Sequence, residues 1–211
     1  MTATATSPKK WDAEAFRETM DQGGDPDYDQ LQQGRLMTRH RHQFAATVVR
    51  SGARILDIGC GTALILDTLV AQGRTPAAYY GVDLFPERLP LVAERLARYG
   101  LGGGYQATQR PFGATLEDAR RHACDTVLML GVFGTEGYST PADLRRLLAT
   151  IGRLDMTVAL TVPVVWPGHD PAQMYRMSEA ELFQALPDDY AASRLHEGLV
   201  GISRKPLPGL S

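Results

Sequence analysis

The sequence has little cysteine and no long apolar run, and both absences narrow its class. Its 211 residues hold two cysteines, Cys60 and Cys124, outside any Cys-x-x-Cys pair or Cys/His cluster with the spacing of metal ligands. Disulfide scaffolds are short and rich in cysteine, so we expect free thiols, a reducing compartment and no metal site. No apolar segment approaches the roughly 20 residues that cross a bilayer, and Met1–Lys10 lacks the apolar core of a signal peptide. We therefore expect a cytoplasmic protein that does not engage the membrane.

The sequence also lacks a clear excess of positive or negative charge. The chain has 22 Lys and Arg against 24 Asp and Glu, which gives a formal net charge of −2. Such a chain has no strong long-range field for nucleic acid, so we expect a small-molecule partner and no nucleic-acid partner. The length indicates one domain of ordinary size. Whether the protein is a monomer or a homodimer stays open.

Short apolar segments alternate with amphipathic ones from residue 54 onward. Strands are expected at 54–58, 78–82, 104–107, 125–130, 156–162, 190–196 and 199–203, and helices at 64–72, 86–99, 116–122, 141–153 and 178–185. This alternation predicts an α/β fold in which a mainly parallel sheet is covered by helices on both faces. Only Glu197-Gly198 separates the last two strands, so they must form a hairpin and at least one must run antiparallel.

The chain before residue 51 has a different character. Residues 1–10 read as a flexible tail, and 11–20 and 28–49 as two helices joined by a Gly, Pro and Asp-rich loop. Helical spacing places Leu36, His40 and Phe44 on one apolar side. We therefore expect a helical N-terminal extension at 11–50 that precedes a main domain at 51–205.

The most informative motif is Asp57-Ile58-Gly59-Cys60-Gly61, at a turn from strand to helix. The glycines let a ligand approach the backbone, at the end of the sheet where α/β folds bind ligands. A dinucleotide fold would have a third glycine where Leu64 stands. Asp57 suits a cationic group, such as the ammonium of an amino acid, better than a pyrophosphate. Asp83, at the end of the next strand, is placed to accept hydrogen bonds from ribose hydroxyls, so the pattern favours a nucleoside that carries an amino acid.

These segments resemble a known family. Residues 55–63, 81–84 and 125–131 are similar to the first three landmarks of class I S-adenosylmethionine-dependent methyltransferases. The resemblance implies a Rossmann-like three-layer sandwich with a seven-stranded sheet whose last strand is antiparallel. It also implies S-adenosylmethionine as cofactor, with an N-terminal extension that covers the active site.

The resemblance assigns a part of the cofactor to several residues. Gly59 and Gly61 would pass beneath the methionine part, Asp57 would act near its ammonium, Asp83 would hold the ribose, and Leu84 would pack on the adenine. The family often has an acid after the third strand, where this chain has Thr108 and Gln109 as neutral substitutes. The full expected set is Asp57, Gly59, Cys60, Gly61, Asp83, Leu84, Thr108, Leu130 and Gly131.

The acceptor is expected near the loops that follow the fourth and fifth strands. Candidate catalytic residues are Glu136 and Tyr138 in the first loop, His169 beside Trp166 in the second, and His40 from the N-terminal helix. Each has a plainer reading. Glu136 also fits a solvated loop acid, His169 an exposed side chain and His40 a packed one. Arg39 and Arg41 fit a solvated helix face or a contact to an anionic substrate.

The sequence therefore predicts methyl transfer to the oxygen or nitrogen of a small molecule. Three alternatives stay open: a non-methylating reaction such as a cyclisation or rearrangement, a protein or nucleic-acid methyltransferase, and a binding subunit with a degenerate pocket. Amino-group methylation of bases is disfavoured, because Gly131-Val132-Phe133-Gly134 stands where an Asn/Asp-Pro-Pro-aromatic run would be expected.

Overall fold

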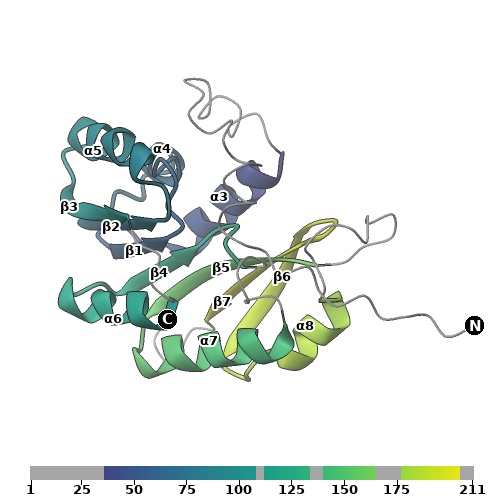
Figure 1. Cartoon of the computed structure of the whole chain (residues 1–211). Helices are drawn as coiled ribbons and strands as arrows, with labels where there is room; N and C mark the ends of the chain where they lie inside the picture. Colours follow the sequence, from purple (N-terminus) through teal and green to yellow (C-terminus); the bar gives the residue numbers. More distant parts are fainter. Residues whose placement is uncertain (1–35, 108–111, 134–139, 165–176, 205–211) are drawn as a thin grey trace, which may run out of the picture.

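The computed structural model describes residues 36–107, 112–133, 140–164 and 177–204, with the backbone alone at 112–114. A sheet of seven strands runs through these residues in the order β3-β2-β1-β4-β5-β7-β6 (Figure 1). The strands are β1 Arg54–Ile58, β2 Ala78–Asp83, β3 Gly102–Ala107, β4 Thr126–Met129, β5 Thr157–Pro163, β6 Tyr190–His196 and β7 Leu199–Arg204. Each lies within two residues of its predicted position.

The strand directions match the prediction from the sequence. β1 pairs in parallel with β2 and β4, β2 with β3, and β4 with β5. β7 is antiparallel to both of its neighbours, β5 and β6. The predicted hairpin is confirmed, and so is the mainly parallel sheet with an antiparallel last strand.

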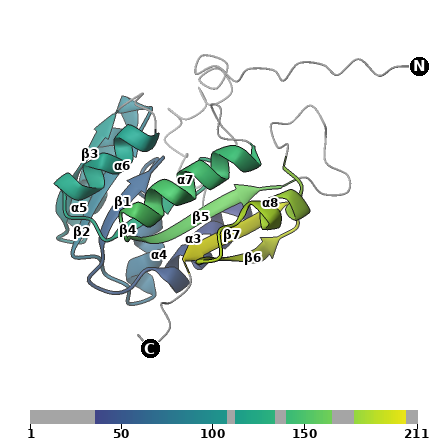
Figure 2. The ribbon, with the colours of Figure 1, turned by 90° about the horizontal axis from the view of Figure 1, so that it is seen from below.

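Helices cover both faces of the sheet and make it the middle of three layers (Figure 2). One face carries α3 Leu36–Val48, α4 Ile65–Ala71 and α5 Leu89–Arg98, and the other carries α6 Phe112–Arg121, α7 Pro141–Arg153 and α8 Glu179–Ala185. Two buried apolar clusters correspond to these faces. One joins the sheet to α6, α7 and α8, and the other joins it to α3, α4 and α5.

Local sequence explains where several helices begin. The Thr140 hydroxyl accepts a hydrogen bond from the Asp143 N–H, and the Asp143 carboxylate accepts one from the Thr140 N–H. α7 therefore begins with a capping box. Ser178 and Glu181 make the same arrangement at α8. The single helix predicted at 86–99 is instead a 3-10 turn, Pro86–Arg88, followed by α5. The reason is Pro90, which has no N–H to continue the first turn and is tolerated only at a helix start.

The described part of the N-terminal extension, α3, belongs to the main core. Phe44, Ala45 and Ala46 are buried in the same cluster as α4 and the central strands. The predicted apolar face is wrong at its first position, because Leu36 is 47% exposed. Residues 11–35 lie outside the described residues. Among the described helices, no segment has the length and apolar character needed to cross a bilayer.

The strand order fixes where a ligand can bind. From β1 the chain proceeds outward to β2 and β3, and it then returns to the other side of β1 with β4. The loops after β1 and β4 therefore diverge to opposite faces and leave a crevice at the carboxyl ends of these strands. Apart from Thr108, the residues predicted for cofactor binding lie at the carboxyl ends of β1, β2 and β4 or directly after them.

Candidate cofactor site

The loop after β1 is held tightly between its neighbours. The N–H groups of Gly59 and Cys60 both donate to the Val82 carbonyl, at 2.7 and 3.1 Å. Gly59 has a φ of +75°, and a Cβ there would lie 2.1 Å from Val132 Cγ2 in the loop after β4. Gly61 also has a left-handed φ, of +54°. Glycine at 59 is thus required by both conformation and space.

Ala63 occupies a left-handed conformation in the same loop, with a φ of 58°. Its side chain is fully buried in the cluster that includes α4. A left-handed backbone at a residue with a Cβ costs about 1–2 kcal/mol relative to glycine. Strain of this size, held in place by surrounding packing, is typical of ligand loops.

Asp57 lies deeper than the sequence prediction assumed. Its side chain is buried, and its Oδ2 accepts a hydrogen bond of 2.6 Å from the hydroxyl of the fully buried Tyr79 on β2. Burial raises the pKa of Asp57 to about 7. The Tyr79 hydrogen bond opposes this rise, and the charge of Asp83 adds to it. Tyr79 was missed by sequence reasoning, although a tyrosine in an apolar strand needs a partner for its hydroxyl, and Asp57 on the adjacent strand is that partner.

Asp83 organises the tips of β1 and β2. Its Oδ2 accepts the Gly61 N–H at 2.7 Å, and its Oδ1 accepts the Phe85 N–H at 3.1 Å and faces Arg88 Nη1 at 3.5 Å. Arg88 is itself buried, with its guanidinium 4.3 Å from the centre of the Phe85 ring. Asp83 therefore fixes the loop that carries Gly61 and keeps its carboxylate at the strand end.

The other described members of the predicted set follow the same strands, β1 and β2, or the neighbouring strand β4. Cys60 is buried beside Gly81, and desolvation raises the pKa of its thiol, so it acts as a packed neutral group. Leu84 and Leu130 are half-buried. Gly131 has a φ of +81°, and its N–H donates to Thr161 Oγ1 of β5 at 2.9 Å.

The two arginines of α3 differ in their surroundings, because Arg39 is exposed and Arg41 is half-buried. A Cβ on Gly131 would lie 2.6 Å from Arg41 Nη1, so the Arg41 guanidinium lies against the loop after β4. Arg41 is half-buried, and the interpretation of a solvated face holds for Arg39 but is wrong for Arg41. His42 lies 3.5 Å from the Thr68 hydroxyl of α4, and burial lowers its pKa to about 4, with Arg41 contributing to the shift.

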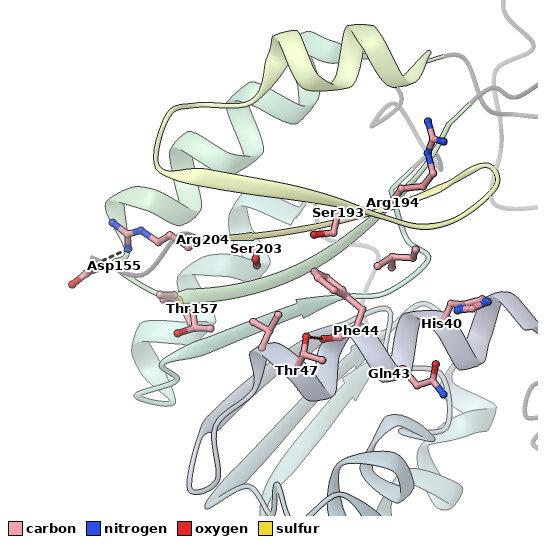
Figure 3. Close-up of a pocket in the computed structure, with 13 residues that line it drawn as sticks. His40, Gln43, Phe44, Thr47, Asp155, Thr157, Ser193, Arg194, Ser203 and Arg204 are labelled. Carbon is pink, nitrogen blue, oxygen red and sulfur yellow. Dashed lines mark hydrogen bonds and ion pairs between the residues drawn. The ribbon is translucent and has the colours of Figure 1, made fainter. Parts of the chain in front are cut away.

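His40 is the one proposed catalytic residue within the described part of the chain. Its ring lies 5.2 Å from that of His196 on β6, and it borders an open groove of about 830 Å³ between α3 and the edge of the sheet (Figure 3). The groove is lined by side chains of α3, β5, β6 and β7 and of the turn before β5, among which no predicted cofactor residue occurs. Glu136, Tyr138, His169 and Thr108 lie outside the described residues.

The arrangement at the strand ends fits a nucleoside that carries an amino acid. The crevice between β1 and β4 has a floor without side chains at Gly59, Gly61 and Gly131. Two buried acids lie at the carboxyl ends of adjacent strands: Asp57 is next to last in β1, and Asp83 is last in β2. Carboxylates accept hydrogen bonds from ammonium and hydroxyl groups, which a sulfonium-linked amino acid and a ribose both offer.

Residues 56–154 match a family model described as a methyltransferase domain. The match spans slightly less than half of the chain and contains the second half of β1, all of β2 and β4, and the loops that follow these strands. The resemblance to class I S-adenosylmethionine-dependent methyltransferases is therefore confirmed over this segment, and the cofactor that it implies is S-adenosylmethionine. No sequence among the curated proteins matches it.

Several solved structures share the fold of this chain. A SAM-dependent methyltransferase from Aquifex aeolicus is 17% identical, with a TM-score of 0.50 over 89% of this chain and 96% of that one. The small RNA methyltransferase HEN1 is 14% identical, with a TM-score of 0.57 over 80% of this chain and 25% of that one. A Rossmann-superfamily protein from Streptococcus agalactiae is 19% identical, with a TM-score of 0.50 over 81% of this chain and 70% of that one. These identities establish a common fold alone, and they lend no support to the expectation that nucleic acid is not a partner.

Proposed function

We propose that this enzyme transfers the methyl group of S-adenosylmethionine to an oxygen or nitrogen atom of a small molecule. The observation that carries the choice of acceptor is the charge of the chain, −2 with 22 basic and 24 acidic residues. An enzyme that holds a nucleic acid needs a concentrated positive surface to attract the phosphate backbone. Gly131, Val132 and buried Phe133 after β4 also differ from the Asn/Asp-Pro-Pro-aromatic run expected for methylation of base amino groups.

We propose the following division of roles at the cofactor. Gly59 and Gly61 pass beneath the methionine part, because a side chain at 59 has no space beside Val132. Asp57 acts near the ammonium, and Asp83 holds the ribose hydroxyls at the end of β2. Half-buried Leu84 packs on the adenine.

Four further residues complete the proposed cofactor site. Buried Cys60 and the half-buried Leu130 and Gly131 form its walls beside the loops after β1 and β4. Thr108, a neutral substitute for the family's acid, accepts a hydrogen bond from the adenine amino group.

The chemistry requires mainly positioning. Bound S-adenosylmethionine supplies an activated methyl group, and an in-line displacement asks the protein to hold the acceptor atom in line with it and to exclude water. A base is needed only where the acceptor must lose a proton. His40, Glu136, Tyr138 and His169 are proposed for that role.

Methyl-labelled S-adenosylmethionine offers a direct test of the acceptor class. The purified chain is incubated with the labelled cofactor and one of three acceptor pools: small phenols, carboxylic acids and amines; unmodified small RNA and tRNA; or a protein extract. We expect label in a small organic product and an equal amount of S-adenosylhomocysteine. Label in RNA or protein would refute the proposed acceptor. A consumed acceptor without S-adenosylhomocysteine would favour the non-methylating reaction instead.

A further inference from the structure

Arg41 projects from α3 toward the cofactor loops. The position that a Cβ would take on Gly131 is 2.6 Å from Arg41 Nη1 and 2.9 Å from its Cζ. Glycine at 131 therefore admits the guanidinium against the backbone that follows β4. The Gly131 N–H is fixed on Thr161 Oγ1 of β5, so this backbone is a firm support for the contact.

The same loop connects Arg41 to the glycine turn after β1. Val132 follows Gly131 directly, and its Cγ2 occupies the space in which a side chain on Gly59 would lie. Arg41, Gly131, Val132 and Gly59 thus form a continuous series of neighbours across the crevice between β4 and β1. The guanidinium borders the part of the crevice that the proposed function assigns to the methionine portion of the cofactor.

Charge complementarity indicates which group the guanidinium serves. The methionine portion carries a carboxylate as well as an ammonium, and the nearby acids Asp57 and Asp83 repel a carboxylate. Two buried arginines of this half lie elsewhere. Arg88 faces Asp83, and Arg95 pairs with Asp67 and donates to the Thr62 carbonyl. The half-buried Arg41 differs from both in its place, because its guanidinium lies against the loop after β4.

We propose that Arg41 binds the carboxylate of the methionine portion of S-adenosylmethionine. The planar guanidinium of arginine matches a carboxylate with two parallel hydrogen bonds, which a point charge such as lysine does not reproduce. This assignment makes α3 part of the cofactor site. It rests on the proposed function only through the placement of the methionine portion beside Gly59 and Gly61.

Calorimetric titration of the full chain with two ligands tests the assignment. S-adenosylhomocysteine carries the carboxylate and the ammonium, and its decarboxylated analogue keeps only the ammonium. We expect Arg41→Gln to weaken binding of S-adenosylhomocysteine about 10- to 100-fold, the usual range for a lost charged hydrogen bond. Binding of the decarboxylated analogue should change less than about threefold. Arg41→Lys should recover part of the loss.

Arg39→Gln is the matched control, because Arg39 is exposed on the same helix. The Arg39→Gln variant should bind both ligands with the affinity of the natural chain. Unchanged affinity of Arg41→Gln for S-adenosylhomocysteine would overturn the proposal, and so would an equal loss for both ligands, which indicates a structural role. If Arg41→Gln does not fold, the natural chain must still prefer S-adenosylhomocysteine to the decarboxylated analogue by at least about tenfold. Failure of the natural chain to bind either ligand would instead refute the cofactor placement.

Discussion

The carboxyl ends of β1, β2 and β4 differ sharply from the groove beside α3. At the strand ends, buried acids are held by specific donors. The Tyr79 hydroxyl bonds to Asp57, and the Gly61 and Phe85 N–H groups bond to Asp83. Along the groove, charged side chains pair with partners at its rim or beyond it. Arg194 pairs with Glu179, and Arg204 pairs with Asp155 (Figure 3).

This difference shows which half of the molecule is organised for a polar ligand. Buried polar groups with fixed partners present hydrogen-bonding atoms in a set geometry, which lowers the cost of binding. The groove has a comparable size to many ligand pockets, but two of its charged side chains, Arg194 and Arg204, are engaged in ion pairs. The contrast predicts that substitutions at the strand ends affect cofactor binding, whereas equivalent substitutions elsewhere affect only the local fold.

The largest effect is expected from a comparison of two glycines with similar backbone angles. Gly59 and Gly73 have φ values of +75° and +70°, but a Cβ meets Val132 at 2.1 Å in the first case and nothing within 4 Å in the second. Gly73→Ala should cost only the left-handed strain, about 1–2 kcal/mol of unfolding free energy. Gly59→Ala should cost that plus about 1–3 kcal/mol of overpacking. It should also weaken S-adenosylhomocysteine binding by more than about tenfold, that is, by more than about 1.4 kcal/mol.

Urea unfolding and calorimetric titration of both variants measure these two effects. Equal stability and equal affinity in the two alanine variants would show that the crowding at Gly59 has no functional consequence.

A second comparison replaces one carboxylate in each region by an amide. Both carboxylate oxygens of Asp83 accept hydrogen bonds, one from the Gly61 N–H and the other from the Phe85 N–H and Arg88. In Asp83→Asn, one of these oxygens becomes an NH₂ group, so a donor faces a donor in either orientation of the amide. We expect about a 10- to 100-fold loss of S-adenosylhomocysteine affinity. Asp155→Asn removes an ion pair whose acid is 81% exposed, which contributes at most about 1 kcal/mol. That variant should bind S-adenosylhomocysteine unchanged in the same titration, and a loss of similar size in both would remove the distinction between the regions.

The smallest and most specific effect concerns pH. The pKa of Asp57 is about 7 in the folded chain against an ordinary 3.8, so between these values the folded state keeps a proton that the unfolded chain releases. The contribution of Asp57 to stability is therefore present at low pH and is lost as the pH rises from about 4 to 7. Cofactor affinity should change in the opposite direction and rise through about pH 7, because the ionised carboxylate attracts the ammonium.

Tyr79→Phe removes the hydrogen bond that lowers the pKa of Asp57, so both pH midpoints should move to higher pH. Asp57→Asn should abolish both dependences. Unfolding and titration over a pH series measure the midpoints, and identical profiles for Tyr79→Phe and the natural chain would contradict this account.

Much of the site was predictable because its signals are local. Glycines at 59 and 61 after an apolar strand, and an acid at 83 after the next, mark the two strand ends whatever the rest of the chain does. Tyr79 and Arg41 were not predictable in their roles. Tyr79 appears in sequence as one more strand residue, and Arg41 as one of several charges on a helix.

The sequence by itself determined the order of strands and helices along the chain, the terminal hairpin and the glycine turn after β1 that we propose meets the cofactor. The physical reason is that hydrophobic periodicity, capping residues and glycine turns act over a few neighbouring residues. Only the tertiary structure decided which side chains meet across elements. It buried Asp57 against Tyr79, brought Val132 over Gly59 and placed Arg41 beside Gly131. Such contacts depend on strand register and helix orientation, which the packing of the whole core fixes.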